Sequence, residues 1–146
     1  MRRRLYGSEG ASAIEFALVL PLLVLFLFGI IEFGLAFARS QGMEAAAREG
    51  ARLASIGRSV DDGQVTQAAR DASPPFIRDE HIAVTISPAG NWCAAQGDRV
   101  TVRVEIAAGQ RDRYRLNIPL FNAGAPPSYA AEGVFRCETR RSSGGS

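Results

Sequence analysis

Glu15 is the residue of greatest chemical interest in this sequence, because its carboxylate stands at the start of a long apolar run. The run begins at Phe16 and contains no charged residue up to Ile31. A carboxylate held in hydrocarbon costs a few kcal/mol. It can instead stay at the level of the lipid headgroups, in a first helical turn whose dipole favours an anion. Position alone leaves both interpretations open, a residue that only starts a helix and a functional acid.

The apolar run predicts a membrane-spanning helix at about residues 16–38. If Glu32 is allowed, the run covers 23 residues and ends at Ala38. At about 1.5 Å per residue this helix is roughly 34 Å long, which is enough to cross a hydrocarbon core of about 30 Å. No second run of this kind occurs in the 146 residues. A multispan transporter is therefore excluded, and a soluble cytoplasmic enzyme is not expected.

The arginines that flank the run bear on its orientation. A count of basic residues near its two ends gives three against four: Arg2, Arg3 and Arg4 before it, and Arg39, Arg48, Arg52 and Arg58 after it. The short N-terminal tail decides the near tie, because it stays in the cytoplasm easily while the longer domain is exported. We expect a single-pass protein of the inner (cytoplasmic) membrane, with its N-terminus cytoplasmic and its C-terminal domain periplasmic or extracellular.

A cleaved signal peptide is the alternative interpretation of the same segment. Ala36-Phe37-Ala38 resembles a small-residue cleavage site, and cutting there would release a soluble protein that begins at Arg39. The apolar run is longer than the usual signal core of about 7–15 residues, and the helical pattern continues past the site. A retained membrane anchor is therefore favoured.

Two cysteines, Cys93 and Cys137, lie far downstream of the apolar run. With His81, the one histidine, they do not match the spacing of a zinc site. A disulfide is favoured if this region lies outside the cytoplasm. A bond between the two cysteines would close a loop of about 44 residues and would stabilise a small head by roughly 4 kcal/mol on the chain-entropy model. We expect a Cys93–Cys137 disulfide, no metal and no cofactor.

Other residues that could do chemistry give no enzyme site. His81 beside Asp79 and Glu80 is interpreted as a surface histidine at the start of a strand, and no G-x-S-x-G nucleophile motif occurs. The charged stretch 111–115 is interpreted as a solvated loop or strand edge. A formal net charge of +2 gives no broad basic field that would attract nucleic acid. The sequence also has no glycine-rich phosphate-binding loop, so a small-molecule substrate is not expected.

The remaining pattern predicts a small α+β head on a long helix. The helix is expected over 11–56, with Pro21 near its start and a stem beyond the membrane. A break at 57–62 carries Ser59 and Asp62 as a weak N-cap signal. The head, residues 57–141, is expected to hold an antiparallel sheet and one disulfide, and residues 142–146 form a flexible tail. Its expected elements are a helix over 61–72, strands over 81–87, 100–106 and 129–137, and a loop over 88–98.

Small residues recur every four positions in the long helix. Such a ridge lets helix backbones approach closely. Alanine is also simply the best helix former, but each interior glycine costs roughly 1 kcal/mol relative to alanine. The pattern therefore favours a packing role for six residues: Gly34, Ala38, Gly42, Ala46, Gly50 and Ala54.

The start of the chain resembles the cleavage signal of type IV prepilin-like proteins. A short basic leader ends at Gly10, and Glu15-Phe16 follow after four residues. The resemblance implies that residues 1–10 are a leader, which a membrane prepilin peptidase removes between Gly10 and Ala11. It also implies that Glu15 pairs with the amino terminus of a neighbouring subunit, so that Glu15 and Phe16 set the register between subunits.

Residues 10–54 resemble the TadE/TadG family of minor pilin-like proteins, or pseudopilins. The resemblance rests on three segments, GASAIEFALVLP at 10–21, GIIEFG at 29–34 and AAAREGAR at 45–52. It implies a non-enzymatic component of the tight-adherence (Flp) pilus, whose partners are the prepilin peptidase, other pilin-like subunits, the assembly platform and the membrane. The alternative is an unprocessed, single-span anchored module for binding or adhesion.

Overall fold

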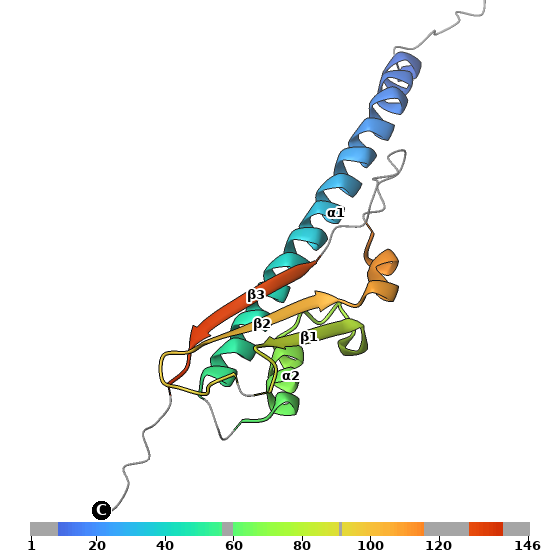
Figure 1. Ribbon diagram of the computed structural model, residues 1–146. Helices are drawn as coiled ribbons and strands as arrows, with labels where there is room; N and C mark the ends of the chain where they lie inside the picture. Colours follow the sequence, from blue (N-terminus) through green and yellow to red (C-terminus); the bar gives the residue numbers. More distant parts are fainter. Residues whose placement is uncertain (1–8, 57–59, 91, 116–128, 139–146) are drawn as a thin grey trace, which may run out of the picture.

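A long helix, α1 (Glu9–Ser55), dominates the computed structural model, which describes residues 9–56, 60–90, 92–115 and 129–138. Its 47 residues give a length of about 70 Å, and it continues through Pro21 without interruption. The N-terminal half of α1 extends away from the other described elements, whereas the C-terminal half lies among them (Figure 1). The expected helix over 11–56 is confirmed to within two residues.

The head contains a three-stranded antiparallel sheet in the order β1-β2-β3. Its strands are β1 (Ile82–Ser87), β2 (Arg99–Ile106) and β3 (Ala130–Arg136). Each of the three predicted strands is found within one residue of its expected ends. In the register of the sheet, Val104 lies opposite Val84 on one side and Ala131 on the other. The α+β architecture is confirmed.

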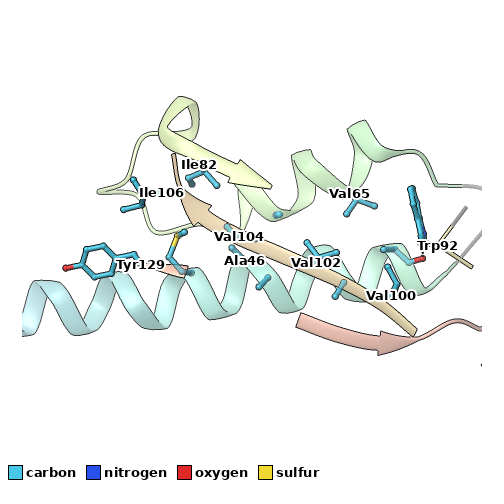
Figure 2. Packing of buried hydrophobic residues seen from close by; sticks show 14 of the residues in the cluster. Ala46, Val65, Ile82, Trp92, Val100, Val102, Val104, Ile106 and Tyr129 are labelled. Atoms are coloured by element: carbon cyan, nitrogen blue, oxygen red, sulfur yellow. Dashed lines mark hydrogen bonds between the residues drawn. The ribbon is translucent and has the colours of Figure 1, made fainter. Parts of the chain in front are cut away.

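The core forms where β2 crosses the C-terminal half of α1 (Figure 2). Alternate residues of β2 are buried, because successive side chains in a strand point to opposite faces. Their partners come from α1 and from α2 (Asp62–Asp71), which packs beside it. The predicted stem is therefore the central helix of the head. The buried hydrophobic residues of these elements are Met43, Ala46, Ala47, Ala51, Ala54, Val65, Ala69, Val100, Val102, Val104 and Ile106.

The sheet approaches α1 so closely that backbone touches backbone. A Cβ built on Gly133 would overlap the Ala47 carbonyl oxygen and would lie 2.6 Å from the Ala47 carbonyl carbon and 2.9 Å from the Arg48 nitrogen. Normal carbon contacts are about 3.5–4 Å. Only glycine at position 133 allows β3 to lie this close to the helix.

Helix α2 begins with a reciprocal cap. The Asp61 carboxylate accepts the backbone N–H of Gln64 at 2.8 Å, and the Gln64 side chain accepts the Asp61 N–H at 3.0 Å. The expected cap at Ser59 was wrong in position, because Asp61 and Gln64 supply the capping-box spacing; Ser59 itself lies outside the described residues.

The disulfide joins Cys93 to Cys137 beside the C-terminal end of α1, with the two Cα atoms 5.5 Å apart. Residues next to each cysteine satisfy carbonyl groups that the helix end leaves without partners. The Trp92 indole N–H donates to the Ala54 carbonyl at 3.0 Å, and the Glu138 N–H donates to the Ser55 carbonyl at 2.9 Å. The predicted disulfide is confirmed, and it holds both segments at the end of α1.

Candidate functional site

Gly10, Ala11 and Glu15 lie in the first two turns of α1. All three residues are exposed, and no atom comes within 4 Å of the position that a Cβ would take on Gly10, outside the neighbouring helix backbone. The Gly10–Ala11 peptide bond lies in the first helical turn, because α1 begins at Glu9. The residues named by the processing motif are thus together on one accessible helix end.

This end of the helix has features that weaken its first turn. The first four N–H groups of a helix have no partner within it. Glycine costs about 1 kcal/mol relative to alanine in a helix, so Gly10 weakens the first turn further. Opening of the backbone at Gly10 disturbs no packed side chain in the described structure.

Glu15 lies four residues after Ala11, on the same side of the helix and about 6 Å further along the axis. Its side chain is exposed, and Phe16 beside it is 64% exposed. Among the ion pairs of the described residues, none includes Glu15. The carboxylate is open to a partner outside this chain, and large apolar side chains surround it.

The apolar half of α1 is covered by large side chains that no described element packs against. Its most apolar window has a mean hydropathy of 2.7 and is 0% buried. Within the described residues, α1 is the one helix long and apolar enough to cross a membrane. The exposed side chains include Leu18, Leu23, Phe26, Ile30 and Phe33. This helix indicates membrane anchoring.

The four-residue ridge is divided between the two halves of α1. Gly34 has nothing within 4 Å of a built Cβ. A Cβ on Gly42 would lie 2.6 Å from the Pro74 ring, and one on Gly50 would lie 3.1 Å from Ala69 and from Val102. Ala46 and Ala54 are fully buried, while Ala38 is partly exposed. In its C-terminal part, the partner of the ridge is the head of the same chain.

His81 is buried, and the expectation of a surface histidine was wrong. It stands just before β1, as expected, but it is 7% exposed. Its Nδ1 lies 2.7 Å from the Tyr114 hydroxyl, and the two rings meet edge to face. The reason is the η2 turn (Ala108–Tyr114), which folds back over the start of β1. Sequence separation hid this contact, since nothing local links residues 81 and 114.

The charged stretch 111–115 lies largely in η2, a 3₁₀ turn, rather than in the loop or strand edge that we expected. Arg111 pairs with Glu105 at 3.4 Å, and Arg115 pairs with Asp112 at 2.9 Å. The short helix allows the Arg115–Asp112 pair, because residues three apart share a face in a 3₁₀ helix. Within the described residues, no group of three or more His, Cys, Asp or Glu side chains could hold a metal ion.

One charged pair on α1 shifts a pKa. The Arg52 guanidinium donates two hydrogen bonds to the Glu49 carboxylate, at 2.6 and 2.9 Å. These bonds, with the charge of Arg52, lower the pKa of Glu49 below its ordinary value. Arg48 also pairs with Glu44 at 3.5 Å, as the four-residue spacing predicts. The side chains of both pairs lie on the exposed surface of α1.

Comparison with known proteins finds one family model that matches most of this helix. Residues 10–52 match the family model described as TadE-like protein. The chain carries a TadE-like segment. The match is consistent with a TadE/TadG-like member, and it begins at Gly10 and includes Glu15 and most of the ridge. No curated protein and no solved structure matches the chain.

The TadE-like segment supports association with the Tad pilus, because the family is one of pilus structural components and is not known for enzymatic activity. The matched range covers the membrane half of α1 and most of the part inside the head. The sheet and the disulfide lie beyond it.

Proposed function

We propose that this chain is a TadE-like pseudopilin, a structural or assembly component of a Tad (Flp) pilus that a prepilin peptidase processes after Gly10. The observation that carries the proposal is the coincidence of the family match with the exposed helix end. The match starts at Gly10, and that residue lies in an uncovered first turn five residues before Glu15. The partners are the peptidase, other pilin-like subunits and the pilus assembly platform.

Cleavage would give Glu15 a partner. It creates an ammonium at Ala11, and the same ammonium on a neighbouring subunit is the charge that the exposed Glu15 carboxylate pairs with. Two unit charges attract far more strongly in a low-dielectric membrane than in water, but the desolvation cost is offset only when both partners are present. A shift of one subunit along another would separate the charges, so the pair sets the axial register.

The proposed orientation places residues 1–10 in the cytoplasm and the head on the outer side of the inner membrane, in the periplasm or beyond. Arg2, Arg3 and Arg4 form the basic leader on the cytoplasmic side. The disulfide supports this placement, because structural disulfides persist in oxidising compartments and are rare in the cytosol.

Processing is tested by determining the N-terminus of the protein from a host that carries the peptidase. We expect the mature N-terminus to be Ala11. We expect the Gly10→Leu protein to remain full length, because a bulky side chain would crowd a cleavage site that suits a residue without one. Gly34→Leu is the matched control, since it adds the same side chain to the same helix at another position with open space. An intact Met1 in the wild-type protein would refute processing and favour an unprocessed anchored binding module, and an N-terminus at Arg39 would show signal-peptide cleavage.

The role of Glu15 is tested separately from processing. In Glu15→Ala, cleavage and membrane insertion should continue while pilus assembly fails, because removal of the carboxylate also removes the cost of placing it near hydrocarbon. Glu32→Ala is the matched control, a second carboxylate of the same helix that lies outside the processing motif at residues 10–16. Normal piliation in the Glu15→Ala strain would show that Glu15 only starts the helix.

A further inference from the structure

The η2 turn lies at the end of the head from which α1 emerges. In Figure 1 this turn, in orange, is beside α1 on the side toward its N-terminal half. The position of η2 along the axis of α1 is fixed by a contact between Arg39 and Tyr114, in which the guanidinium carbon lies 5.6 Å from the ring centroid. The Tyr114 hydroxyl is held in turn by His81 at 2.7 Å and by the Arg78 N–H at 3.3 Å. The height of η2 along α1 is therefore that of residue 39.

That height coincides with the surface of the membrane that α1 crosses. Counted from Phe16, the 20 residues needed to cross about 30 Å of hydrocarbon end at Leu35. Arg39 lies four residues further, about 6 Å along the axis. Each headgroup layer is about 5–7 Å thick. Arg39 and the turn packed on it are thus level with the lipid phosphates.

The charges at this end suit phosphate groups. Arg111 and Arg115 are paired with Glu105 and Asp112, respectively. Two further arginines are not neutralised in the described structure. Arg113 is exposed and forms no hydrogen bond or ion pair, and the buried Nε of Arg39 has no hydrogen-bond partner. A guanidinium matches the geometry of phosphate oxygens, which accept its N–H groups in pairs.

We propose that Arg39 and Arg113, positioned by Tyr114, form a docking surface for anionic phospholipid headgroups, so that the head rests on the membrane in which its own helix is anchored. Because α1 runs unbroken from the span into the head, anchoring already brings this surface to the lipids. The proposal rests on anchoring by α1 and is independent of processing at Gly10.

The test uses the full chain in nanodiscs of phosphatidylcholine, alone or with phosphatidylglycerol, and measures how fast an uncharged polyethylene-glycol maleimide labels a single added cysteine. Gly109→Cys reports on η2, where a side chain meets open space. Ala89→Cys reports on the loop after β1, at the opposite end of the sheet. Leu23→Cys reports on the span. The Cys93–Cys137 bond is verified in each variant by peptide mapping.

Phosphatidylglycerol should slow labelling of Gly109→Cys severalfold and leave Ala89→Cys unchanged. Adding Arg113→Glu should restore the fast rate, since each arginine near an anionic surface is worth about 1 kcal/mol, or about a fivefold change in the docked population. Arg136→Glu, which alters an exposed arginine at the far end of β3, should have no effect. Equal labelling of Gly109→Cys in the two lipids, or equal effects of the two glutamate substitutions, would overturn the proposal. Rapid labelling of Leu23→Cys would overturn it by showing that α1 is not in the membrane.

Discussion

The contact between Gly133 and the α1 backbone predicts that the smallest possible substitution there is severely destabilising. Gly133→Ala adds one methyl group, which would overlap the Ala47 carbonyl oxygen and lie 2.6 Å from its carbon. Neither side can yield by a side-chain rotation, because both surfaces are backbone. β3 must therefore move away from α1 by about 1 Å, the difference between 2.6 Å and a normal carbon contact.

The loss of stability follows from separating β3 from α1, which are packed against each other in the core. Overpacking a well-packed core costs about 1–3 kcal/mol, occasionally more, and the rigid neighbours here place Gly133→Ala at the upper end. For a domain of this size, 1 kcal/mol corresponds to about 4–8 °C in melting temperature. We therefore expect the midpoint of head unfolding to fall by about 10 °C or more.

Trp92 provides the assay, because it is the one tryptophan of the chain and is 5% exposed at the end of α1. Its fluorescence is followed during thermal and urea unfolding of the full chain in detergent micelles. Gly109→Ala is the matched control, since its methyl group meets open space. Gly50→Ala should fall between the two, because its 3.1 Å contacts are with the side chains of Ala69 and Val102 and alanine improves helix propensity. A Gly133→Ala protein as stable as Gly109→Ala would refute the backbone contact.

Three further predictions concern the head. Removing the disulfide with Cys93→Ser and Cys137→Ser together should lower the free energy of unfolding by about 2–4 kcal/mol, measured by urea unfolding, and an unchanged midpoint would show that the bond adds no stability. Tyr114→Phe should cost about 1–3 kcal/mol in the same assay, because His81 loses a hydrogen-bond partner while buried; a neutral effect would mean that water replaces the hydroxyl. The lowered pKa of Glu49 makes its pairing with Arg52 favourable above the ordinary value of 4.5, and that contribution is lost as the pH falls through the lower pKa of the folded state. Glu49→Gln should therefore reduce stability by less than about 1 kcal/mol at neutral pH and have no effect in strong acid, whereas a difference that persists in strong acid would contradict the ion pair.

Local patterns sufficed to predict the helices and strands. The valines of β2 alternate with polar residues, and this two-residue period belongs to a half-buried strand. The long apolar run and its alanine-rich continuation predicted α1. The disulfide was predictable because the two cysteines had no metal-site spacing and the small head needed a covalent link. Each of these inferences depends on residue types close together in the chain or on simple pair counting.

Contacts between distant segments could not be predicted in the same way. Arg39, His81 and Tyr114 come from a helix, a strand start and a 3₁₀ turn, and nothing in their local sequence links them. Gly133 did carry a usable signal, since a glycine inside a strand marks a close backbone approach. The Asp61–Gln64 spacing likewise indicated the α2 cap. These two signals were readable and were missed, whereas the Arg39–Tyr114 contact required the fold.

The residue sizes along α1 explain how one helix serves two environments. Lipid chains adapt to any side-chain shape, so the N-terminal half can carry large residues such as Phe26 and Ile30. A sheet backbone cannot adapt, and it reaches the helix backbone at Ala47, where the helix surface is small. The change occurs near Arg39, within a single unbroken helix. A sharp tilt of the head relative to the span would therefore require breaking backbone hydrogen bonds of α1, so the membrane helix itself limits the directions in which the sheet can face.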